Sequence, residues 1–238
     1  MPVLYLVPTP LSENAVQQVL PPDVISVVHG LQQFVVENIR TARRFLSKIG
    51  HPQKIELLRF RELNEHTSER ELIDLLPFLL MADTGVLSEA GLPGVADPGA
   101  EIVRLAHANN IRVVAMAGSS SIFMALMASG LNGQSFAFAG YLPKKQAERQ
   151  ARLRALEKRS ANENQTQIFI ETPYRNMHLL EDILKTCHPS TMLTIAADIT
   201  GAREFILTQS IRQWKNKLPE LNKIPVVFLL AANGKKQI

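Results

Sequence analysis

Residues 88–99 read Ser88-Glu89-Ala90-Gly91-Leu92-Pro93-Gly94-Val95-Ala96-Asp97-Pro98-Gly99 and lie between an apolar run and a helix-like segment. Three glycines and two prolines in this stretch exclude a helix interior or a central strand, because glycine opens unusual backbone conformations and proline removes a donor. Long shaped loops are usually functional, so we expect a ligand-binding loop here. The alternative is an ordinary turn between a strand and a helix.

Short apolar runs alternate with amphipathic stretches on both sides of this loop, which is typical of an α/β protein. In the first half of the chain the pattern predicts strands at 3–7, 24–28, 55–58, 84–88 and 111–115. We expect the strand at 111–115 to be buried. It predicts helices at 34–48, 68–81, 100–109 and 119–129.

The second half repeats the alternation. Strands are expected at 136–140, 167–171, 192–197, 204–208 and 226–231, and helices at 145–159, 175–186 and 211–217, with a polar connector at 160–165. We therefore expect two α/β lobes, residues 1–117 and 118–238, with a ligand cleft between them, because lobe interfaces commonly hold ligands.

Composition limits the class of protein. The 238 residues are 46% hydrophobic and 20% charged, as in ordinary globular proteins. No apolar run reaches the roughly 18 residues of a membrane span, and the N-terminus lacks the features of a signal peptide. A single cysteine, Cys187, excludes an internal disulfide. We expect a cytoplasmic protein that does not associate with a membrane.

Basic residues gather in one predicted helix. Between residues 144 and 159 there are seven cations against two acids, Glu148 and Glu157. The cations are Lys144, Lys145, Arg149, Arg152, Arg154, Lys158 and Arg159. Such a face attracts phosphate backbones, and a solvated helix surface is the alternative.

Other catalytic classes have no signature here. The six histidines are scattered and lack metal-ligand spacing, so we expect no metal. There is no G-x-S-x-G nucleophile elbow, no G-x-G-x-x-G fingerprint and no P-loop.

The glycine–proline loop resembles the S-D-A-G-T-P-x-x-S-D-P-G signature of the tetrapyrrole-methylase superfamily of S-adenosylmethionine (SAM) methyltransferases. Further segments resemble the family's motifs in its order: 4–10 (LYLVPTP), 64–65 (NE), 118–121 (GSSS), 128–131 (ASGL), 140–143 (GYLP) and 171–175 (ETPYR). The similarity is greatest to the branch that methylates a ribose 2′-hydroxyl in small-subunit ribosomal RNA.

This resemblance implies SAM as cofactor, ribosomal RNA or the small ribosomal subunit as partner, and a homodimer. The implied SAM contacts are Pro10, Gly91, Leu92, Pro93, Ala96, Ser120, Ser121, Glu171 and Ala197. For Ser120 and Ser121 the alternative is helix capping, which is compatible with a ligand contact.

Methyl transfer needs an acceptor oxygen held in line with the methyl group and sometimes a proton acceptor. Glu89 and Asp97 are the candidate catalytic residues because both lie in the predicted SAM loop, and capping, turn hydrogen bonds or an ion pair are their alternatives. Glu65 is a third candidate, for the substrate. Tyr174 and Arg175 are candidates to stack on a base and hold a phosphate, or else form the first turn of a packed helix.

Two motifs depart from the pattern of the RNA branch. Residues 11–16 read LSENAV where that branch has I-G-N-L-x-D, and residues 37–42 read ENIRTA where it has E-D-T-R-x-T. Glu89 also replaces the usual aspartate. These changes leave open two alternatives: methylation of a tetrapyrrole or another small molecule, and SAM binding without turnover.

Overall fold

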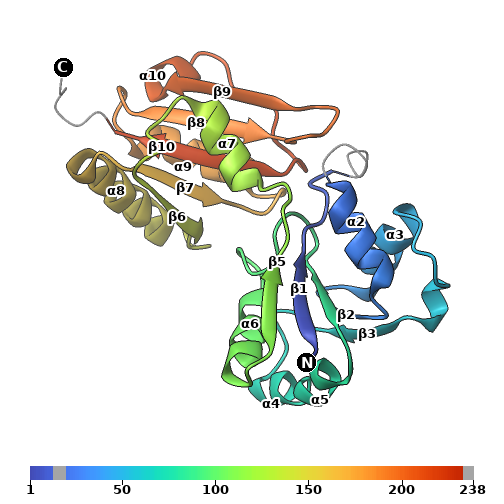
Figure 1. The fold of residues 1–238 in the computed structure, drawn as a ribbon. Coiled ribbons are helices and arrows are strands. Elements are labelled where there is room, and N and C mark those ends of the chain that lie inside the picture. The colour runs from blue at the N-terminus through green and yellow to red at the C-terminus, as the bar shows by residue number, and fades with distance from the viewer. Residues whose placement is uncertain (13–19, 233–238) are drawn as a thin grey trace. The chain divides into compact units, whose positions relative to one another are not determined.

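The computed structural model describes residues 1–12 and 20–232, which divide into two compact units, one that ends at Ser120 and one that begins at Ser121. Each unit contains a five-stranded sheet with helices packed on it (Figure 1). The predicted α/β class is confirmed.

The sheet of the first unit is parallel throughout, in the order β3-β2-β4-β1-β5. Its strands are β1 (Val3–Val7), β2 (Gln33–Val36), β3 (Arg59–Glu62), β4 (Thr84–Leu87) and β5 (Arg112–Ala115). The helices are α2 (Pro22–Gly30), α3 (Ile39–Lys48), α4 (Glu69–Ile73), α5 (Leu76–Met81) and α6 (Gly99–Ala108), with a 3₁₀ turn, η1, at Ile55–Leu57.

Side chains that alternate along the strands build a core on each face of this sheet. Phe34 and Val36 of β2 pack in the cluster that contains α2 and α3. Val35, between them, packs in the cluster that contains α5 and α6. Helices α3 and α6 therefore cover opposite faces.

Two predicted strands of the first unit are wrong. Residues 24–28 lie in helix α2, because Pro22 stands at its first turn and Val24 and Val28 turn the same face to the core. Residues 55–57 form η1, Leu58 follows it, and the strand starts only at Arg59.

Two predicted helices of this unit are divided. The segment 34–48 holds buried strand β2 before Asn38, whose side chain accepts hydrogen bonds from the amides of Arg40 and Thr41 and starts α3. The segment 68–81 contains α4 and α5, with Pro77 in the first turn of α5. Strand β5 lies at the sheet edge and is partly exposed, not buried.

The second unit has the sheet order β6-β7-β10-β8-β9, in which only β6 and β7 are parallel neighbours. The strands are β6 (Phe136–Tyr141), β7 (Thr166–Ile170), β8 (Met192–Ala197), β9 (Phe205–Ser210) and β10 (Val226–Ala231). The helices are α7 (Ser121–Ser129), α8 (Gln146–Glu163), α9 (Asn176–Thr186) and α10 (Ile211–Trp214).

Helices α8 and α9 pack on one face of this sheet around Phe169 and Phe228, while α7 contacts β9 and β10 (Figure 1). Helix α8 continues to Glu163 through most of the predicted connector and ends at Asn164, which has a left-handed backbone conformation. None of the helices in the described residues is long and apolar enough to cross a membrane.

Candidate active site

All five parallel strands of the first sheet have their carboxyl ends on the same side, so the loops that follow them lie together at the carboxyl-terminal end of the sheet. The loops that follow β1, β2 and β4 are neighbours, because Val7 and Val36 both pair with Leu87. Ligands bind at this end in open α/β sheets. Glu65 is exposed and lies after β3, at the same carboxyl-terminal end of the sheet.

The loops after β1 and β4 are joined by their backbones. The amide of Thr9 donates to the carbonyl of Gly91 over 2.8 Å, and the amide of Gly91 donates to the carbonyl of Thr9 over 3.1 Å. The loop after β5 is equally close, since a Cβ on Gly118 would lie 2.2 Å from Cβ of Pro8. The loops after β1, β4 and β5 are therefore held close together around Gly91.

Positive backbone φ angles shape the glycine–proline loop. They are 81° at Gly91, 83° at Gly94 and 63° at Ala96. A Cβ on Gly91 would lie 3.3 Å from Leu11 Cδ2 and 3.7 Å from the carbonyl oxygen of Ser119. Glycine at residue 91 thus leaves bare backbone at a crowded position, where a ligand can approach closely.

Asp97 holds the end of this loop. Its Oδ1 accepts hydrogen bonds from the amides of Gly94 and Gly99, each over 2.7 Å. Its Oδ2 is buried and has no hydrogen-bond partner among the described residues. Burial raises the pKa of Asp97, and the two amide hydrogen bonds oppose that rise. One oxygen of this predicted catalytic residue is thus used to form the turn.

Glu89 lies closer to open space than Asp97. Its Oε2 accepts from Thr41 Oγ1 over 3.3 Å, and its amide donates to Oε2 of Glu37 over 3.3 Å. Burial raises the pKa of Glu37, the Glu89 amide lowers it, and the charges of Asp97, Glu89 and Glu65 raise it further. Glu37, Glu89 and Asp97 are therefore grouped around the turn that follows β4, and the charge of Glu65 also acts on Glu37.

Sequence reasoning did not select Glu37 as a site residue. The only signal was its position at the start of the segment 37–42, which partly matches a family motif. Its proximity to Glu89 results from the pairing of β2 with β4, which the sequence does not give.

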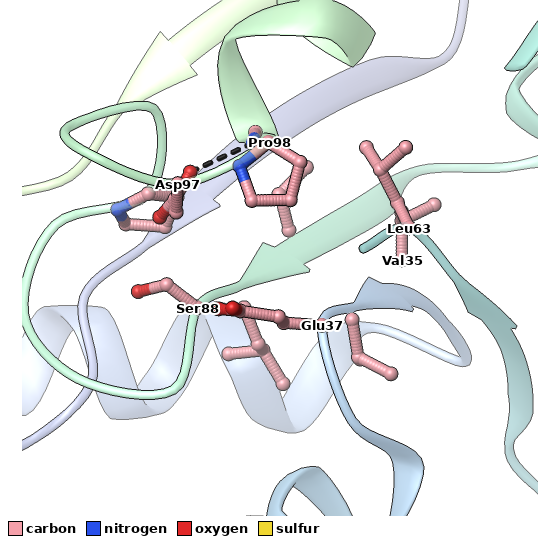
Figure 2. Close-up of a pocket in the computed structure, with 11 residues that line it drawn as sticks. Val35, Glu37, Leu63, Ser88, Asp97 and Pro98 are labelled. Atoms are coloured by element: carbon pink, nitrogen blue, oxygen red, sulfur yellow. Dashed lines mark hydrogen bonds between the residues drawn. The ribbon is translucent and has the colours of Figure 1, made fainter. Parts of the chain in front are cut away.

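Ser88 lines two hollows. The smaller, about 10 Å³, is bounded by Asp97 and Pro98 on one side and by Ser88 and Glu37 on the other (Figure 2). It has room for a water molecule at most. The larger is a groove of about 570 Å³, within the range of small-molecule sites. Its lining residues are Thr9, Pro10, Leu11, Ser12, Thr41, Ala42, Arg44, Phe45, Lys48, Leu87, Ser88, Glu89 and Ala90.

The structure places predicted donor residues around this groove and loop. Pro10 lines the groove, and Pro93 lines the small hollow. Leu92 and Ala96 lie in the loop, and Ser120 ends the first unit. Residues 13–16 of the divergent segment lie outside the described residues.

Two predicted SAM contacts of the second unit lie at the ends of strands that both pair with β10. Glu171 follows β7 and Ala197 ends β8, on either side of the start of β10. Glu171 is 5% exposed, and its Oε1 accepts from the Thr172 amide over 2.7 Å and from the Arg175 guanidinium. Its Oε2 has no partner among the described residues. The predicted SAM roles of Glu171 and Ala197, and that of Ser121 at the start of α7, stay predictions.

The predicted RNA contacts of the second unit differ in exposure. Lys144, Lys145, Arg152 and Tyr174 are exposed, the last to 72%. Arg149 is only 7% exposed and forms an ion pair with Asp182, so it does not belong to the surface basic face. The guanidinium of Arg175 is paired with Glu171.

No group of three or more histidine, cysteine, aspartate or glutamate side chains in the described residues is placed to hold a metal ion. The donors at the site are backbone amides, hydroxyls and carboxylates. This set suits a ligand that hydrogen-bonds to the main chain.

Comparison with known proteins defines the class. The family model for tetrapyrrole (corrin/porphyrin) methylases matches residues 23–214. The chain is therefore a methyltransferase, and it belongs to the tetrapyrrole methylase family.

Relatives named ribosomal RNA small subunit methyltransferase I match most of the chain. The one from Pasteurella multocida is 28% identical over 99% of this chain and 81% of its own length. The one from Vibrio cholerae is 31% identical over 86% of this chain and 67% of its own length. Among solved structures, the methyltransferase CobJ superposes with a TM-score of 0.65, covering 100% of this chain and 97% of its own. At 15% identity, this likeness shows a shared fold.

Proposed function

We propose that this protein transfers the methyl group of SAM to a ribose 2′-hydroxyl of small-subunit ribosomal RNA. The observation that carries the proposal is the backbone joint between Thr9 and Gly91, which fixes the glycine–proline loop, the proposed donor site, beside a groove large enough for the acceptor nucleoside. The relatives with ribosomal RNA methyltransferase names supply the substrate class.

The residues of the loop fit a SAM molecule. The bare backbone at Gly91 offers a close approach for the ligand, and Asp97 maintains the turn that presents it. In the proposal Pro10, Leu92, Pro93, Ala96 and Ser120 complete this part of the donor site. Bound SAM would supply the methyl group of its sulfonium, and a neutral thioether, an excellent leaving group, would depart.

The chain's own residues then position the acceptor and receive its proton. A ribose hydroxyl held against the methyl group gains most of its rate from orientation. Glu89 lines the groove, so its carboxylate is placed to accept the hydroxyl proton. Glu37, whose pKa is raised, accepts a hydrogen bond from the Glu89 amide and so holds the Glu89 backbone in place. Asp97 contributes by maintaining the turn.

The proposal also includes a homodimer acting in the cytoplasm, where ribosomal subunits assemble. The family resemblance supports the dimer. Exposed apolar side chains in the second unit, Phe123 and Met127 of α7 and Leu207 of β9, offer it a surface. Light scattering of the full chain tests it, and a monomer at micromolar concentration would contradict it.

The decisive experiment is labelling with tritiated SAM. The protein is incubated with small ribosomal subunits, naked ribosomal RNA and a small-molecule extract, and the labelled product is mapped. We expect one ribosomal nucleotide to be labelled and to resist alkaline cleavage. A Glu89→Gln variant should bind SAM normally and transfer methyl more slowly. Label on a base or on a tetrapyrrole, or on no acceptor, would overturn the proposal.

A further inference from the structure

Helix α3 is rich in basic residues. Residues 39–50 include four cations and no acid. Ala42, Phe45 and Leu46 face the core, so the polar side chains point away from it. Among the described residues, no ion pair involves Arg40, Arg43 or Arg44.

Three of these cations form one stripe. Arg43 is directed elsewhere, since its Cζ lies 5.4 Å above the Phe60 ring. Arg40, Arg44 and Lys48 recur every four residues, which places them on one side of the helix about 6 Å apart along its axis. We call these three residues the α3 cationic face.

The α3 cationic face borders two hollows. Arg44 and Lys48 line the 570 Å³ groove together with Glu89 and the loop after β1. The same two residues line a second, more open hollow of about 440 Å³, whose other members include Ile55 and Glu56. The two cations therefore stand where the groove meets the open surface of the first unit.

We infer that the α3 cationic face binds the phosphates on either side of the acceptor nucleotide and so directs that nucleotide into the groove. This inference rests on the proposed function and names the RNA-contacting surface of the same site. Regularly spaced cations suit a polyanionic strand, whereas a small acidic ligand needs donors that converge on one point. The groove accommodates a nucleotide that is unstacked, as in an RNA loop or bulge.

The test is the double variant Arg44→Gln/Lys48→Gln of the full chain. Its control is Arg70→Gln/Arg104→Gln, which removes two exposed cations from α4 and α6. Thermal unfolding of all proteins checks that they fold. Filter binding to naked ribosomal RNA across a salt series, SAM calorimetry and methyl-transfer kinetics are then compared.

We expect the α3 variant to raise KM for RNA by tenfold or more, with SAM affinity within twofold of wild type. Loss of two phosphate contacts should reduce the slope of log K against log salt by about 1.4 for a single strand. The single variant Arg40→Gln should give a smaller change in the same direction.

The two proposals fail in different ways. If the wild type labels no ribosomal RNA, the proposed reaction fails, while the filter-binding slopes still decide whether α3 binds RNA. If the wild type methylates RNA and the α3 variant matches the control in KM and slope, the inference alone is overturned. Loss of SAM affinity in the α3 variant would also overturn it, because the groove would then hold the donor.

Discussion

Arg149 on α8 donates from Nε to Oδ2 of Asp182 on α9 over 2.7 Å, and both side chains are almost fully buried. Gln146 and Gln150 donate to the other oxygen of Asp182, over 3.0 and 2.9 Å. Burial acts to raise the pKa of Asp182, but these hydrogen bonds and the Arg149 charge hold it below the usual range. This buried ion pair links the basic helix α8 to α9.

Arg149→Ala should therefore destabilise the protein by about 3–5 kcal/mol, because it leaves a buried carboxylate without its cation. The double variant Arg149→Met/Asp182→Leu should recover most of that loss. Urea unfolding at neutral pH measures both. A single variant within 1 kcal/mol of wild type would show that the pair contributes little.

Gly91→Val should reduce SAM affinity at least tenfold in a folded protein. Valine is strained at a φ of 81°, and its Cβ would press on Leu11. Gly50→Val is a matched control, since Gly50 has a φ of 71° and open space around its Cβ position. Isothermal calorimetry compares the two. Unchanged SAM affinity in folded Gly91→Val would remove the loop from the donor site.

Glu37 should make the free energy of unfolding depend on pH. Its folded pKa is raised, so its contribution to stability is complete below the unfolded value of 4.5 and is lost as pH rises through the folded value. Glu37→Gln keeps an acceptor for the Glu89 amide and removes this titration. The stability of the variant relative to wild type should therefore increase from pH 4 to pH 7.5 in denaturant titrations. Glu56→Gln, at an exposed acid, is the control, and parallel curves for the Glu37 variant and wild type would refute the argument.

The exposed cations of α8 should contribute to RNA affinity separately from α3. Lys144→Ala/Arg152→Ala/Lys158→Ala leaves Arg149 in place and removes three exposed charges. We expect its salt slope for RNA to fall by about 2. Arg212→Ala/Lys215→Ala/Lys217→Ala removes three exposed cations in and after α10 and should keep the wild-type slope. Equal slopes for both variants in filter binding would assign α8 to the solvated surface.

Strands that form separate apolar runs could be predicted from the sequence, including the short strands β1, β4 and β5, whereas β2 and the nature of residues 24–28 could not. Strands β8 and β10 are six-residue apolar runs with the predicted bounds. The apolar run 24–28 fits a strand or a helix equally well, and Pro22 with the packing of Val24 and Val28 decided for a helix. Strand β2 was missed because four residues before a helix carry little periodic signal.

The same limit applies to the candidate site. The glycine–proline loop was recognisable because its residues impose their own backbone shape. Glu37 was not, since it meets Glu89 across 52 residues of chain. The burial of Arg149 depends on Asp182, 33 residues away, so its charge alone placed it wrongly on the surface.

The joint between Thr9 and Gly91 contains two main-chain hydrogen bonds, and the Thr9 hydroxyl also donates to the carbonyls of Ser88 and Gly91. Any residue at position 9 except proline can supply the same amide and carbonyl, so a change of side chain removes only the hydroxyl contacts and leaves the main-chain pair in place. The sequences of the loop after β1, which lines the groove, and of the glycine–proline loop can therefore diverge independently, while the distance between the two loops stays fixed. Altered side chains at Leu11 and Ser12 change what the groove admits without moving Gly91.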